Sequence, residues 1–224
     1  MPVTLSSQPN VEPAIKRKIN KAQPGTVRLW TIQPLTVWTN LLKTGTLLVD
    51  HTHEDFADGS DKQMLEAYDW LREQMDVRIP NYDGSYPWWA YTHFLDLRFY
   101  RFQQRPPNKI NVRIELAIPR EKVLLSAYGD WHCVLNRWFC PYDNSDEGNE
   151  IEFDRWIEDA ESVGVNVFHA CPLPEPWESD MRTSWSNIFD IVRMSAGGTI
   201  QGTFEKLELA EVVSVTMFTS QWSN

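Results

Sequence analysis

Alternation of apolar and polar residues predicts several β-strands along the chain. Apolar side chains occupy every second position of residues 110–118, which is the period of a strand with one buried face. Residues 27–32 alternate and are rich in β-forming side chains, and residues 199–207 and 212–219 show the same character. A shorter apolar run at residues 123–125 predicts one further strand.

A second pattern, with apolar residues three and four positions apart, predicts helices between the strands. The first begins at Pro34 and ends at Gly45, because proline is favoured at the first helical position and glycine at the C-terminal one. The other predicted helices cover residues 61–76, 130–138, 150–162 and 177–192. Four tryptophans on the apolar helix faces are predicted core residues: Trp38, Trp131, Trp138 and Trp185.

The order of these elements indicates an α+β fold. Strands occur at the start, middle and end of the chain, without regular βαβ alternation or an internal repeat. We therefore expect a single domain over residues 27–224, with helices packed around a mostly antiparallel sheet. Residues 1–26 contain Pro, Gly and Ser together with a basic patch, and they predict an N-terminal arm that is partly flexible.

Composition places the chain among ordinary globular proteins apart from its 11 tryptophans. A chain of 224 residues with 42% hydrophobic residues can bury a core without disulfides. The three cysteines form no CxxC pair, and no signal peptide or membrane-length apolar stretch is evident. These features favour a cytoplasmic protein with no membrane partner.

Charge narrows the choice of partners. Asp and Glu number 31 against 21 Lys and Arg, a net charge of −10. General nucleic-acid binding is not expected, because it depends on positive charge. An acidic protein that binds a basic partner or mimics nucleic acid stays open, and so does a solvated surface that aids solubility.

Motifs for common chemistries are absent. His51 and His53 lie beside acidic residues, but no third ligand follows at a defined spacing, so no metal is expected. The chain has neither a G-x-S-x-G elbow nor a phosphate-binding G-x-x-x-x-G-K-[ST] loop. Glu115 and Glu205 lie within predicted strands. Each carboxylate could face a cleft as an acid, base or charge stabiliser, or could face solvent.

Several segments, in order and spacing, resemble uncharacterised bacterial and phage proteins grouped as domain-of-unknown-function family 3841. The resemblance covers roughly residues 27–219. It is carried by residues 28–34, Val37-Trp38, 112–115, 122–126, 131–138, 185–190 and 200–204. It implies little about activity.

A more distant resemblance is to ADP-ribosyltransferase-like folds, through the first strand, the helix ending in Gly, the middle strands and a final strand beginning at Gln201. That resemblance implies NAD as cofactor. In such enzymes the first strand carries an Arg or His for NAD, an aromatic ring stacks on nicotinamide, and a Glu of the last strand polarises the ribose. Arg28 or Trp30, with Thr31, would bind NAD here, and Tyr91 or Trp88 would stack.

The sequence departs from that pattern at one position. Thr203 stands where the Glu of Gln-x-Glu is expected, and Glu205, two residues on, would face the same side of the strand. The resemblance thus implies catalytic roles for Gln201 and Glu205 in a transferase that modifies a macromolecular target, in a phage or host-defence setting. The alternative is a non-enzymatic acidic interaction protein that inhibits a host factor or mimics nucleic acid. The aromatic stretch around Trp88, Trp89 and Tyr91 favours a ligand cleft in either case.

Overall fold

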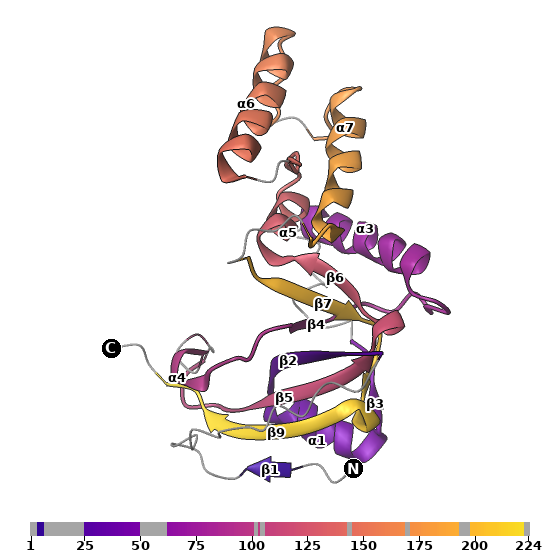
Figure 1. Cartoon of the computed structure of the whole chain (residues 1–224), viewed down its shortest axis with the longest axis vertical. Helices are drawn as coiled ribbons and strands as arrows, with labels where there is room; N and C mark the ends of the chain where they lie inside the picture. The colour runs from indigo at the N-terminus through magenta and orange to yellow at the C-terminus, as the bar shows by residue number, and fades with distance from the viewer. Residues whose placement is uncertain are drawn as a thin grey trace. The chain divides into compact units, whose positions relative to one another are not determined.

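The computed structural model divides the chain into two compact units. It describes residues 4–6, 25–49, 62–100, 103, 106–142, 145–168, 171–192 and 198–221. The first unit, here called the sheet unit, comprises Met1–Asp50, Asp76–Leu124 and Gly202–Asn224. The second, here called the helical unit, comprises His51–Met75 and Leu125–Gln201. Figure 1 shows their elements.

Three long strands form the centre of the sheet unit: β2 (Thr26–Pro34), β5 (Ile110–Pro119) and β9 (Val212–Thr219). β2 and β5 pair antiparallel over their whole length, and β9 pairs antiparallel with the other edge of β5. The short strands β4 (Trp88–Tyr91) and β1 (Thr4–Ser6) extend the sheet, β4 antiparallel to β2 and β1 parallel to β9. These strands lie side by side in Figure 1.

The described strands of the larger sheet follow the order β1-β9-β5-β2-β4-β7-β6. Its last two strands are β7 (Ile200–Phe204) and β6 (Leu124–Ala127). The chain passes from one unit to the other within each of them, and it does so again within helix α3 (Lys62–Arg78). A second sheet in the sheet unit pairs β3 (Thr46–Leu47) with β8 (Leu207–Glu208). Shorter elements of this unit are α4 (Leu97–Tyr100), η1 (Arg120–Lys122) and η3 (Leu209–Glu211).

One face of the sheet unit's β-sheet is the apolar core. Leu29, Ile114 and Leu116 are fully buried there. Helix α1 (Leu35–Thr44) packs against β2 and β5 and buries Trp38 and Leu41. It ends at Gly45, whose left-handed φ of 79° lets its N–H reach the Leu41 carbonyl at 2.9 Å.

The helical unit is held together by aromatic side chains. Its helices, besides most of α3, are α5 (Tyr128–Leu135), α6 (Asp146–Ser162), α7 (Trp177–Ser184) and the 3₁₀ helix η2 (Trp185–Phe189). The ring of Trp70 on α3 stands edge-on to Trp185 at 5.5 Å and stacks on Phe189 at 5.7 Å. Trp156 of α6 stacks on Phe139 and meets Trp177 edge-on, which fixes α6 against the start of α7.

The expected α+β class with a mostly antiparallel sheet is confirmed by these elements. Each predicted strand has a counterpart, and residues 212–219 match β9 at both ends. The burial of Trp38, Trp131 and Trp185 is also confirmed.

Some details differ from the predictions. Trp138 is not a core residue: α5 ends at Leu135, Arg137 takes a left-handed φ of 53°, and Trp138 beyond it is 42% exposed. Residues 177–192 form α7 and a separate 3₁₀ turn rather than one helix. β4 arises in the aromatic stretch, for which no strand was predicted.

Two predicted features are described only in part or not at all. Of the expected arm, Thr4–Ser6 forms β1 and residues 25–26 are described; the basic patch lies outside the described residues. The loop with His51 and His53 also lies outside them. None of the described helices combines the length and apolar character that a membrane span requires.

Candidate functional site

The face of the sheet opposite the apolar core is polar, and it is the strongest candidate site in the sheet unit. Residues that lie directly opposite each other on paired strands point to the same side. Trp30 lies opposite both Glu115 and Tyr91. We call this surface the polar sheet face; it is formed by Arg28, Trp30, Tyr91, Arg113, Glu115, Ser214 and Thr216.

The Glu115 carboxylate is the centre of the polar sheet face. Its side chain is only 4% exposed, and its Oε1 lies 3.3 Å from Nε of Arg28. The hydroxyl of Ser214 donates a 2.5 Å hydrogen bond to Oε2. A buried carboxylate needs such partners, because removal from water disfavours the charge. The strands β2, β5 and β9 thus hold one carboxylate in a fixed orientation.

Beside Glu115 lies a second buried ion, Arg113. Its guanidinium donates to the Leu95 carbonyl at 2.8 Å and to the Thr216 hydroxyl at 3.3 Å. The ring of Phe94 covers it at 4.1 Å from Cζ, and the same ring meets Trp30 edge-on at 6.2 Å. Phe94 is itself 42% exposed. An aromatic side chain at the surface therefore covers this part of the polar sheet face.

Two donors of β2 on this face have no hydrogen-bond acceptor among the described residues. They are the indole Nε1 of Trp30 and Nε of Arg28, and both atoms are buried. Nε of Arg28 still has its 3.3 Å ion pair with Glu115, whereas the Trp30 N–H has no acceptor among the described residues. Most buried polar groups in proteins are paired, so an exception calls for an explanation. The Trp30 N–H suits a ligand that brings its own acceptor atoms, such as phosphate oxygens.

The segment after β4 adds a histidine near the polar sheet face. The His93 ring lies 5.3 Å from the ring of Tyr91, and its Nε2 is 3.1 Å from the Tyr100 hydroxyl. Burial lowers the pKa of His93 below its usual value. Burial thus favours the neutral form of this imidazole.

Not every residue of the expected NAD site lies on this face. Arg28, Trp30 and Tyr91 share it, but Thr31 points to the opposite side of β2, where it is buried and accepts a bond from Gln33 Nε2 at 2.9 Å. Trp88 alternates away from Tyr91 on β4, and its indole N–H donates to the Leu47 carbonyl at 3.1 Å. Gln201 belongs to the helical unit and donates to the Ser126 hydroxyl at 3.3 Å.

Glu205 does not lie in a strand, contrary to the prediction. β7 ends at Phe204, and Glu205 begins the bend that follows, so strand alternation does not align it with Thr203. Its Oε1 is 2.7 Å from Nζ of Lys206, which also binds Asp83 at 3.0 Å. Burial raises the pKa of Glu205, and a hydrogen bond from Ser85 is the main cause that lowers the pKa of Asp83.

Sequence reasoning missed most of the residues around Glu115. Alternation in β5 could have placed Arg113 beside Glu115, since the two are two positions apart. It could not have shown that Trp30 lies opposite Glu115, because the register between strands far apart in sequence is a tertiary property. Ser214 and Thr216 carry no motif and are found only through the pairing of β9 with β5.

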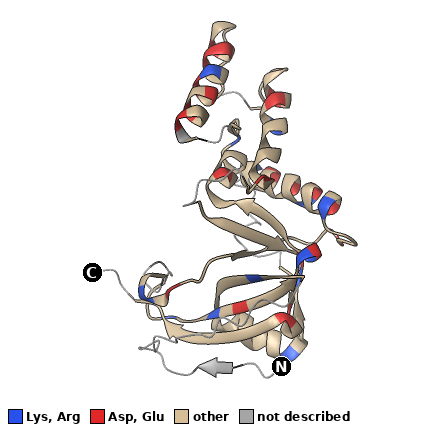
Figure 2. Cartoon of the chain, viewed as in Figure 1, with Lys and Arg blue, Asp and Glu red and all other residues tan. Residues whose placement is uncertain are grey.

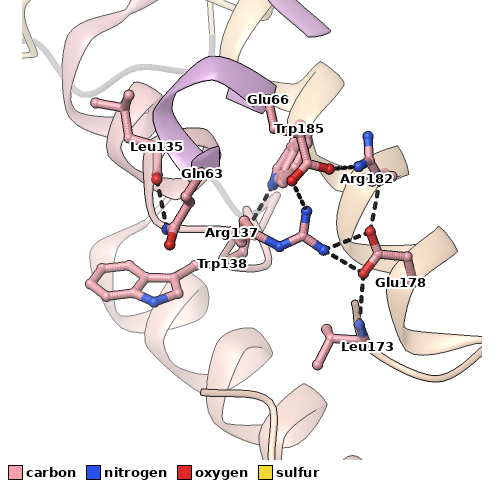
Figure 3. Close-up of polar contacts among 9 residues, drawn as sticks. All are labelled: Gln63, Glu66, Leu135, Arg137, Trp138, Leu173, Glu178, Arg182 and Trp185. Carbon is pink, nitrogen blue, oxygen red and sulfur yellow. Dashed lines mark hydrogen bonds and ion pairs between the residues drawn. The ribbon is translucent and has the colours of Figure 1, made fainter. Parts of the chain in front are cut away.

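The helical unit contains a second charge cluster, drawn in Figure 3, in which Arg137 and Glu178 are largely buried and Glu66 and Arg182 are partly exposed. Arg137 donates to Glu66 at 2.5 Å and to both carboxylate oxygens of Glu178 at 2.7 and 2.6 Å. Arg182 pairs with both glutamates as well. Two guanidiniums and two carboxylates thus neutralise one another. They join α3, α7 and the turn that follows α5, and we interpret the cluster as structural.

Among the residues that the structure describes, no three His, Cys, Asp or Glu side chains are grouped as a metal site would need. Carboxylates are concentrated on α6, as Figure 2 shows. That helix has eight acidic residues and one basic residue, Arg155.

The sheet, its polar face and the surrounding helices define an α+β protein, and comparison places it in a family. A family profile described as a domain of unknown function, DUF3841, matches residues 28–213. The chain belongs to this family. No curated protein and no solved structure matches the chain.

Proposed function

We propose that this protein is an NAD-dependent ADP-ribosyltransferase-like enzyme that modifies a macromolecular target, and that its site is the polar sheet face. The observation that carries the proposal is a buried carboxylate, Glu115, flanked on the same face by Arg28 and two aromatic rings, Trp30 and Tyr91. These are the group types that the cleavage of a nicotinamide–ribose bond uses.

In the proposed reaction the bond between ribose C1′ and the nicotinamide nitrogen breaks, and its electron pair leaves with nicotinamide. The positive charge that develops on the ribose needs a nearby fixed anion. Glu115 supplies it, rather than Glu205, because Glu115 lies on the face of Arg28 and Trp30. A nucleophile of the target then forms the new bond to C1′ and releases its proton to solvent.

Arg28 and Trp30 of β2 would hold the cofactor. The pyrophosphate of NAD would accept from the buried Nε1 of Trp30 and would share the charge of the Arg28 guanidinium with Glu115. Charge-assisted bonds to phosphate are among the strong hydrogen bonds of proteins. The Tyr91 ring, which belongs to the residue opposite Trp30 on β4, would stack on the nicotinamide.

The test is binding and turnover of NAD by matched variants. Calorimetry should show saturable NAD binding, and labelled NAD with cell extract should transfer label to a macromolecule. Glu115→Gln should lower transfer at least about 100-fold, as loss of one charge stabiliser typically does. Glu205→Gln, the same change elsewhere in the sheet unit, should leave transfer unchanged. Folding of both variants is checked by circular dichroism.

Absence of NAD binding by the wild-type chain would contradict the proposal. That result would favour the second candidate, a non-enzymatic acidic protein that binds a basic partner. The observation behind it is α6, with its eight carboxylates and single Arg155. In that case the α6 substitutions Glu150→Gln, Asp154→Asn and Glu158→Gln should weaken capture of the basic partner. Glu115→Gln should leave that capture unchanged.

A further inference from the structure

A pocket of about 260 Å³ lies in the sheet unit, away from the polar sheet face. Its apolar lining consists of Ile79, Pro80, Ile118 and Phe204. Ile118 belongs to the core side of β5, with Ile114 and Leu116, whereas Glu115 points to the other side. The volume is just below that of typical small-ligand pockets. The pocket is thus a separate cavity with room for a small ligand.

Charged side chains of both signs line the rest of this pocket. Lys122 Nζ lies 3.0 Å from Glu208 and 3.1 Å from Glu211. Lys206 Nζ lies 2.7 Å from Glu205, which lines the pocket, and 3.0 Å from Asp83, which does not. Each ammonium is therefore shared by two carboxylates. With every group ionised, the three lining carboxylates exceed the two ammoniums by one, and Asp83 adds a further negative charge.

Two of these carboxylates, Glu205 and Glu211, are held in a poorly hydrated place. The side chain of Glu211 is 10% exposed, and that of Glu205 is 15% exposed. Burial raises the pKa of Glu211 to about 7, although Lys122 opposes the shift, and burial raises the pKa of Glu205 as well. A cation brought into the pocket would relieve this cost, since an opposite charge favours the ionised carboxylate.

We propose that the pocket binds a small organic cation, an alkyl ammonium or alkyl guanidinium, with the cationic group paired to Glu205 and Glu211 and the alkyl stem on Ile79, Ile118 and Phe204. An anion would have to compete with two carboxylates for each lysine. A bare metal ion would leave the apolar lining without a role. The inference does not depend on the proposed NAD site.

The test is calorimetric titration of the full chain with agmatine, which has a guanidinium, a butyl stem and an ammonium. Butyrate, with a similar stem and the opposite charge, is the matched ligand control. Agmatine should bind saturably at one site and butyrate should not. Glu211→Gln and Glu205→Gln should each weaken agmatine binding about tenfold, because each removes one charge-assisted interaction.

Glu121→Gln is the matched protein control, since Glu121 lies on η1 beside the pocket but is exposed and does not line it. It should leave agmatine affinity within about twofold, as surface changes away from a site usually do. Saturable binding of butyrate, no binding of agmatine, or equal agmatine affinity in wild type and Glu211→Gln would overturn the proposal. Titration of the same variants with NAD tests the proposed NAD site separately, so that failure of one proposal is not mistaken for failure of the other. A Gly-Arg-Gly peptide distinguishes an arginine side chain of a partner from a free small molecule as the source of the cation.

Discussion

The Glu211 carboxyl makes stability depend on pH. Its pKa is raised from 4.5 to about 7 in the folded chain, mainly by burial, so the folded state holds a proton that the unfolded state has already released between these values. Stability should therefore fall as pH rises from about 5 to about 8, by on the order of 3 kcal/mol from this group. Urea denaturation at several pH values measures the slope.

Glu211→Gln removes the titrating group, so its stability should change less over the same pH range than that of wild type. Glu205 contributes in the same direction, since its pKa is also raised, and it stays in both proteins. The lowered pKa of Asp83 acts only at acidic pH, below this window. Glu121→Gln serves as the control. An unchanged slope in Glu211→Gln would show that burial does not hold the proton on this carboxyl.

Individual residues of the candidate site also show how far it could be predicted from the sequence. The resemblance to ADP-ribosyltransferase-like folds implied ligand roles for Arg28, Trp30 and Tyr91, and the three do share one face. Glu115 was recognised as a strand carboxylate, but Glu205 was preferred because it seemed to continue β7. The strand ends one residue earlier, at Phe204, so strand alternation no longer predicts the side on which Glu205 lies.

Among the elements, β7 depends on a glycine for close packing. A Cβ at Gly202 would lie 2.9 Å from Val123 Cγ1 and 3.2 Å from both Leu29 methyl carbons. Leu29 and Val123 are buried, so they have little room to move. Gly202→Ala should therefore lower the free energy of unfolding by about 1–3 kcal/mol in urea denaturation.

Two further variants make the Gly202 prediction specific. Val123→Ala removes the nearest methyl group and should recover part of the loss when combined with Gly202→Ala, which a double-mutant cycle detects. Gly129 lies in α5, and nothing comes within 4 Å of a Cβ there. Gly129→Ala should be neutral or should stabilise by up to about 1 kcal/mol. Additive losses in the double variant would contradict the close contact.

Periodicity predicted most elements of this fold because their buried faces follow the helix or strand period. The five apolar positions that alternate through β5 are one case, and the buried face of α1 is another. It failed where a local backbone change ended an element. Arg137 at φ 53° stops α5 before Trp138, and β4 is only four residues long, too short to show a period. Strand register and partners lay beyond the sequence altogether.

For the whole molecule, chain connectivity predicts a single cooperative unfolding transition. Each unit has its own buried residues, such as Leu29 in the sheet unit and Trp185 in the helical unit. Yet the chain passes between the units inside α3, β6 and β7. If one unit unfolded alone, it would fray regular elements that the other unit needs. Scanning calorimetry should therefore give a calorimetric enthalpy equal to the van't Hoff enthalpy.

One variant in each unit tests this coupling. Gly202→Ala perturbs the sheet unit. Arg137→Met perturbs the helical unit by removing one of the two guanidiniums that pair with Glu66 and Glu178. Loss of one partner from a buried ion cluster typically costs about 3–5 kcal/mol, and Arg182 should hold the loss to the lower end. Arg155→Met, an exposed change on α6, is the control and should cost less than about 0.5 kcal/mol. Under coupling, Gly202→Ala and Arg137→Met each lower the midpoint of one shared transition. Two resolved transitions, with each variant moving only its own, would mean that the units unfold independently despite the elements that run through both.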